Sequence, residues 1–223
     1  MSEWWTYTLS DFLLFSPRTY YRLFELYNTE VWPEHMAAIA LGLAILALWR
    51  RNARWIAAIL SGLWLWVAWA FLLTRYDTIN WAAKYFAVGF IAQAGLLAVF
   101  GFFRSGFQLR PFADRVGVAG MAMFVFALAL YPLIGRLAGR PWIQSEVFGI
   151  APDPTVVATL GVLVAATRPN FLLLVIPIAW CAVSGATLWT MGSPDAIVLP
   201  LAGVLAIVLT AWTAGREQKS SPA

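Results

Sequence analysis

Most of the residues that could do chemistry lie in or beside one polar stretch. Residues 135–155 read GRLAGRPWIQSEVFGIAPDPT and form the longest polar interruption between apolar runs. Asp153-Pro154 fits a helix start, with aspartate as N-cap and proline in the first turn. Capping therefore accounts for Asp153, whereas Glu146 has no such role and is the best single candidate for a functional carboxylate. Its basic neighbours Arg136 and Arg140 could equally pair with it as a structural contact.

Three further residues are candidates for contact with a solute. His35 lies near the start of an apolar run, Gln93 near the middle of another, and Trp180 too deep in a third to belong to an interfacial aromatic belt. Each also has a structural interpretation. His35 suits a helix start, Gln93 can hydrogen-bond across membrane helices, and Trp180 can fill space between them. The sequence leaves both interpretations open.

The residue types that other chemistries need are missing. The chain has one histidine and one cysteine, Cys181, so it cannot assemble a haem held by two histidines or a zinc site of several His and Cys ligands. No serine motif accompanies His35. We therefore predict no catalytic, cofactor-binding or metal-binding residues. An enzyme that uses Glu146, Asp153 and His35 is the least supported function.

Composition indicates a membrane protein. Hydrophobic residues make up 61% of the chain and charged residues 12%, whereas soluble domains carry about 25% charged residues. The net charge of +4 does not indicate nucleic-acid binding, because the basic residues cluster in short loops, as the positive-inside rule requires. The predicted fold is an all-α polytopic transmembrane helix bundle, a single integral membrane domain over residues 1–223.

Apolar runs predict about seven spans. The first part of the chain, residues 4–32, predicts an interfacial amphipathic segment, in which Ser16-Pro17 is the N-cap and first position of a helix ending near Asn28. It would be an anchor in the headgroup zone or a lid over a cavity. The tail, 215–223, is polar. The predicted spans are 33–49, 55–73, 81–103, 116–134, 154–167, 171–189 and 196–214.

The fifth predicted span is unusually short. Residues 154–166 are thirteen apolar residues, about 20 Å of helix against a hydrocarbon core of about 30 Å. Short membrane segments broken by Gly and Pro point to a site at membrane depth. We predict that residues 147–151 are buried in an outward cavity, with Asp153 capping the helix at its floor. The wall would come from the last two spans and from Gln93.

Charge predicts how the chain is threaded. With seven crossings and the N-terminus outside, nine basic residues lie inside and six outside; if the fifth segment does not cross, the count reverses. The positive-inside rule therefore favours seven crossings with the C-terminus inside.

The opening WWTYTLSDFLLFSPRTYYRLFELYN resembles the start of an uncharacterised family of small multi-pass bacterial inner-membrane proteins. The resemblance implies a location in the inner (plasma) membrane. It carries no known activity, so no functional residues transfer from it.

Two functions remain in competition. The first is a small permease or solute-binding membrane protein with an outward-facing cavity, whose candidate solute-facing residues are Glu146, Asp153, Gln93, Trp180 and His35. The second is a non-catalytic subunit or scaffold that packs against partner membrane proteins or a second copy of the chain. The bilayer is the one partner that both require, and neither needs a cofactor.

Overall fold

The computed structural model describes residues 15–104, 107–111 and 113–220, and for 217–220 the backbone only. It confirms the all-helical bundle. Within the described residues there is no β-strand, only an isolated bridge between Leu109 and Ala166. The first part of the predicted interfacial segment, residues 4–14, lies outside the described residues.

The helices follow the apolar runs. Their bounds are α1 Pro17–Glu30, α2 Glu34–Leu48, α3 Ala53–Trp66 with η3 Val67–Leu73 and η4 Tyr76–Thr78, α4 Ala83–Leu96 with η5 Leu97–Phe103, α5 Arg115–Val125 with η6 Phe126–Leu130 and α6 Tyr131–Leu137, η7 Trp142–Gln144, α7 Pro152–Val164, α8 Leu172–Thr190 and α9 Val198–Ser220. Among the described residues, five helices are long and apolar enough to cross a bilayer, or six if α1 and α2, bent by 88°, count as one span.

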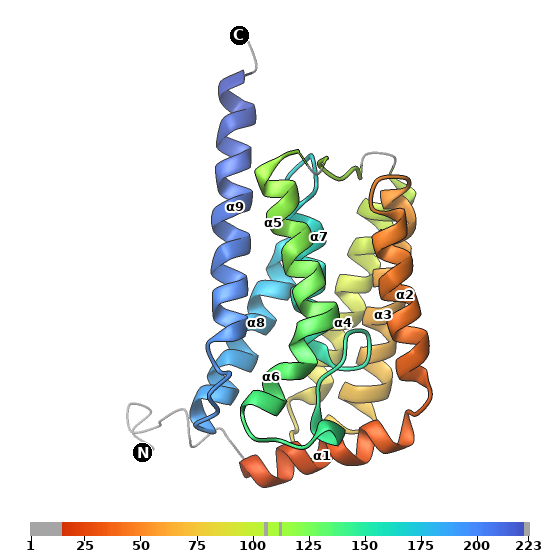
Figure 1. Ribbon diagram of the computed structural model, residues 1–223, viewed down its shortest axis with the longest axis vertical. Helices are drawn as coiled ribbons and strands as arrows, with labels where there is room; N and C mark the ends of the chain where they lie inside the picture. Colours follow the sequence, from red (N-terminus) through yellow and green to blue (C-terminus); the bar gives the residue numbers. More distant parts are fainter. Residues whose placement is uncertain (1–14, 105–106, 112, 221–223) are drawn as a thin grey trace, which may run out of the picture.

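Helix α1 lies across one end of the bundle, roughly perpendicular to the other helices (Figure 1). As predicted, Ser16 caps it: the Ser16 hydroxyl accepts a hydrogen bond from the Thr19 N–H at 3.2 Å, and Pro17 occupies the first turn. Its apolar face is buried against the bundle, and the Phe24 and Phe71 rings lie 5.0 Å apart. This geometry is that of a cover, because the apolar face contacts protein.

Helix α7 is the centre of the bundle. All thirteen of its residues are buried, and it packs against α3, α5, α8 and α9. A helix enclosed by protein need not match the bilayer thickness, since protein satisfies the backbone that precedes it. Phe148, Ile150 and Ala151 are at most 1% exposed, as predicted for the stretch 147–151. Helix α7 begins at Pro152 and ends at Val164, two to three residues earlier than predicted.

Two glycines let α5 and α7 approach closely. A Cβ on Gly161 would lie 2.5 Å from the Gly120 carbonyl oxygen and 2.8 Å from the Phe124 nitrogen. A Cβ on Gly120 would lie 2.4 Å from the Gly161 carbonyl oxygen. Close backbone approach at small residues is the usual way for membrane helices to gain packing contacts. This crossing therefore fixes the position of α7.

The far end of α7 lies beside the loop between α4 and α5. The Arg110 N–H donates to the Ala165 carbonyl at 2.8 Å, and the Thr167 N–H donates to the Gln108 carbonyl at 2.8 Å. The last turn of α9 points to the same end, opposite α1 (Figure 1). Helix α7 thus runs from the α1 end towards the opposite end, which is the direction that seven crossings require.

The orientation of the bundle in a membrane remains a prediction, and reporter fusions test it. Reporters fused after Ala223 and inserted within residues 104–115 are both expected to report the cytoplasm, because these segments lie at the end rich in arginine. A reporter inserted between Gly139 and Arg140 should report the opposite side. A tail found on the same side as that third insertion would contradict the crossing of α7.

Candidate functional site

Asp153 is the centre of a buried polar cluster. The N-cap of α7 is Ala151, not Asp153, and no side chain caps the helix, so the predicted capping role of Asp153 is wrong. The helix starts at Pro152, which places the aspartate in its first turn, facing α8. The carboxylate accepts hydrogen bonds from Trp180 Nε1 and Ser184 Oγ, both at 2.7 Å, and from the Tyr131 hydroxyl at 3.4 Å. Asp153 is 1% exposed.

This carboxylate lies below the end of the bundle, not at its surface. Ser184 precedes the end of α8, at Thr190, by six residues, which corresponds to about 9 Å of helix. The sequence predicted this depth, since it placed Asp153 at the floor of an outward cavity, but it predicted an open cavity above the carboxylate. The carboxylate lies at this depth because the polar stretch before α7 descends into the bundle.

Glu146 is buried beside Asp153. It is 5% exposed, and its Oε2 has no hydrogen-bond partner among the described residues. Burial raises the pKa of the Glu146 carboxyl well above its ordinary value; the neighbouring Asp153 raises it further, and Arg140 opposes both with a smaller effect. The sequence predicted a candidate solute-facing carboxylate. The structure gives an enclosed carboxyl that favours its protonated form.

Arg140, one of the two arginines that the sequence left open as a partner of Glu146, pairs with another carboxylate. Arg140 Nη2 lies 2.5 Å from Asp195 Oδ2, and both side chains are largely buried. The guanidinium also stacks 4.3 Å from the centre of the Tyr21 ring, and the Tyr21 hydroxyl contacts Ser193 Oγ at 2.6 Å. Ser193 in turn contacts Asp195 Oδ1 at 2.5 Å. This network joins α1, the polar stretch and the turn between α8 and α9.

Two of the five predicted residues lie apart from the cluster. His35 Nε2 contacts Asn28 Oδ1 at 3.2 Å, while Asn28 Nδ2 donates to the carbonyls of Ile143 and Ser145, at 2.7 and 2.9 Å. His35 therefore helps hold α1 against the polar stretch.

The amide of Gln93 donates to the Leu173 carbonyl at 3.0 Å, an interhelical hydrogen bond. Leu173 precedes Trp180 by seven residues in α8, about 10 Å of helix. Gln93 therefore contacts α8 well away from Trp180, the residue of this helix that binds Asp153. This is contrary to the prediction that Gln93 and Asp153 line one cavity. The structure joins Asp153 to Trp180 by a hydrogen bond, and the Glu146 carboxyl interacts electrostatically with Asp153. Tyr131 and Ser184, which sequence reasoning missed, also bind Asp153. Ser184 lies one helical turn after Trp180, but nothing in an apolar run shows which face meets α7.

The cluster is occluded. Trp180 and Ser184 line a cavity of about 10 Å³ that is closed by Tyr20, Phe71 and Tyr76, enough for about one water molecule. The open outward cavity predicted above Asp153 is therefore closed in this structure, and Tyr20 of α1 contributes to the closure.

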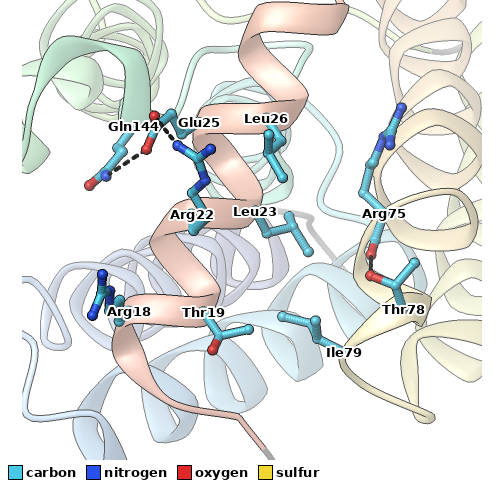
Figure 2. Close-up of a pocket in the computed structure, with 10 residues that line it drawn as sticks. All are labelled: Arg18, Thr19, Arg22, Leu23, Glu25, Leu26, Arg75, Thr78, Ile79 and Gln144. Atoms are coloured by element: carbon cyan, nitrogen blue, oxygen red, sulfur yellow. Dashed lines mark hydrogen bonds and ion pairs between the residues drawn. The ribbon is translucent and has the colours of Figure 1, made fainter.

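A larger cavity of about 600 Å³, the outer cavity, also borders α1. Figure 2 shows Arg22 and Gln144 both directed at the Glu25 carboxylate, with Arg75 on the opposite wall. Leu23 lines this outer cavity and Tyr20, one turn away, lines the inner one. Because Tyr20 and Leu23 lie on the same face of the helix, α1 borders both the buried cluster and a wide polar cavity.

Over the described ranges, no group of three or more His, Cys, Asp or Glu side chains could hold a metal ion. The cluster instead combines two carboxyl groups with neutral donors and aromatic rings: Trp180 packs edge-on against Phe90, with ring centres 5.0 Å apart. Such a site can hold a proton or a small cation.

The fold and site define a class: an all-helical bundle with helices long and apolar enough to be transmembrane and a carboxyl pair enclosed within it. A family model, described as a family of unknown function (DUF6064), matches residues 18–221. The chain belongs to this family, in agreement with the resemblance of its N-terminal residues to an uncharacterised family. No curated protein and no solved structure matches the chain.

Proposed function

We propose that this protein is a small permease or solute-binding protein of the bacterial inner membrane, linked to protons through Glu146 and Asp153. The observation that carries the proposal is the burial of both carboxyl groups, which are at most 5% exposed, with Asp153 bound to Ser184 about 9 Å below the end of α8. Ionisable groups at such depth are costly, and in membrane proteins they usually serve transport or proton transfer.

The two carboxyl groups are suited to different roles. Asp153 has three neutral donors, which stabilise its charged form, whereas Glu146 Oε2 has none among the described residues. Two neighbouring carboxylates in a poorly solvated site do not both ionise readily. Glu146 is therefore the proton acceptor of the pair, and Asp153 supplies the negative charge that a proton or cationic solute balances.

Helix α1 is the gate in this proposal. Moving Tyr20 would join the inner cavity to the outer one, because both cavities border α1. Transporters commonly alternate between occluded and open states around a fixed site. The occluded site is the state that the structure describes.

Proton flux into proteoliposomes tests the proposal. With a pH-sensitive dye inside and an imposed membrane potential, wild-type protein should carry protons, and Glu146→Gln and Asp153→Asn should reduce the flux at least about tenfold, since each removes an ionisable group from the pair. Asp77→Asn is the matched control, because Asp77 lies in η4 and lines neither the inner nor the outer cavity. It should leave the flux within about twofold of wild type.

The pH dependence of thermal stability tests the role of Glu146 without a transport measurement. The folded protein holds the Glu146 proton more tightly than the unfolded chain does, because its pKa is raised on folding. Glu146 therefore contributes stability at acid pH that is lost as the pH rises through the raised pKa. Glu146→Gln should flatten this pH dependence of thermal unfolding. In the proteoliposome assay, equal proton flux with the wild type, the two carboxyl variants and the control would contradict the permease proposal and favour the scaffold.

A further inference from the structure

A second cavity lies at the opposite end of the bundle from α1. It has a volume of about 380 Å³ and is formed by the turn between α2 and α3 together with residues 107–109. Three of the residues that line it are arginines, Arg50, Arg51 and Arg54, and no carboxylate occurs among its described lining residues. We propose that this cavity binds a phosphate group, as found in an anionic phospholipid headgroup or in a free phosphate.

The guanidinium groups suit a phosphate. Arginine presents several donors in a planar fork that matches phosphate oxygens. Stacking on Phe102 holds Arg54 in place: the guanidinium carbon lies 4.4 Å from the centre of the Phe102 ring. A cation that is already oriented by stacking loses less freedom when it binds an anion.

The N-terminus of α3 is a second feature that favours binding of an anion in this cavity. Helix α3 begins at Ala53, and its N-cap, Asn52, makes no side-chain capping hydrogen bond. Both residues line the cavity. Helix N-termini present backbone N–H groups and the positive end of the helix dipole, which together favour anions. The uncapped start of α3 therefore borders the cavity in which the phosphate would bind.

A buried hydrogen-bond donor without a partner is further evidence for a ligand, and this evidence does not depend on the arginine charges. Trp49 also lines the cavity; it is 2% exposed, and its Nε1 has no hydrogen-bond partner among the described residues. An indole N–H can only donate, and a buried donor without an acceptor is unfavourable. A phosphate oxygen in the cavity would satisfy it.

The outer cavity beside α1 provides a contrast. It too contains arginines, but Arg22 pairs with Glu25 and Arg75 pairs with Glu30. Arginines in loops are expected on the inner side of any membrane protein. The cavity at the α2–α3 turn differs because Arg51 and Arg54, an uncapped helix start and a residue with a buried unpaired donor, Trp49, all line one space.

Lipid binding to the full-length protein tests the inference. In nanodiscs of phosphatidylcholine with a minor fraction of phosphatidylglycerol, native mass spectrometry should show phosphatidylglycerol retained by wild-type protein. Arg51→Gln/Arg54→Gln should weaken retention at least about tenfold, and Trp49→Phe several-fold, since each removes charge-assisted or buried hydrogen bonds. Arg115→Gln is the matched control: it is exposed and outside the cavity, and should stay within about twofold of wild type.

Titration with inorganic phosphate in pure phosphatidylcholine discs distinguishes the sources. Binding of phosphatidylglycerol alone identifies a lipid headgroup, and binding of both ligands identifies a general phosphate site. Trp49→Phe keeps the test decisive if the double variant folds poorly, because it preserves an aromatic ring at that position. Retention that is unchanged in both variants, or lowered equally by Arg115→Gln, would overturn the inference.

Discussion

Replacing Gly161 with alanine is expected to destabilise the bundle by about 3 kcal/mol, at the upper end of the range for overpacking, and to lower the yield of folded protein. The added Cβ would lie 2.5 Å from a carbonyl oxygen and 2.8 Å from a backbone nitrogen of α5. Neither atom belongs to a flexible side chain, so one of the two helices must move. Since α7 carries Asp153, that movement would also disturb the buried cluster. Thermal unfolding followed by fluorescence-detected size exclusion measures the effect.

Gly95→Ala is the matched control for this prediction. Gly95 lies within α4, and a Cβ there meets no atom within 4 Å. Alanine favours a helix over glycine by about 1 kcal/mol, so the control should be unchanged or slightly more stable. An unfolding temperature of Gly161→Ala that equals that of Gly95→Ala would show that α5 and α7 do not cross at these glycines.

Removing one member of the Arg140–Asp195 pair should have an effect of similar size. Arg140→Leu leaves Asp195 buried with only the Ser193 hydroxyl as donor among the described contacts. Breaking a buried ion pair in this way costs about 3–5 kcal/mol. The substitution also removes the stacking of the guanidinium on Tyr21, which helps hold α1 on the bundle. We therefore expect lower stability together with easier proteolysis at α1.

A double-mutant cycle measures the interaction between Arg140 and Asp195 separately from the other contacts of each residue. Arg140→Leu/Asp195→Asn removes both charges and should recover part of the stability that Arg140→Leu loses, because no unpaired buried charge remains. Arg136→Leu is the control, since Arg136 is exposed and should change stability by less than about 0.5 kcal/mol. Strict additivity of the two single substitutions would mean that Arg140 and Asp195 do not act as a pair.

The class of fold and most helix bounds could be predicted from the amino-acid sequence alone. Long apolar runs that end at arginines can satisfy their backbone in a membrane only as helices. The third predicted span, 81–103, corresponds to α4 and η5 from Ala83 to Phe103, and the predicted 171–189 corresponds to α8, Leu172–Thr190. Local chemistry was equally informative at Ser16-Pro17, where the cap depends only on neighbouring residues.

The contacts between polar side chains could not be predicted from the sequence, because they depend on how the helices pack. Asp153 binds side chains 22 to 31 residues away, and Arg140 pairs with Asp195 across 55 residues. Helices that are apolar on all sides carry no stripe to reveal which face meets which neighbour. In this protein that choice depends on close contacts such as Gly120 with Gly161, which form only once the helices pack. The descent of the polar stretch into the bundle, and with it the burial of Glu146, follows from the same packing.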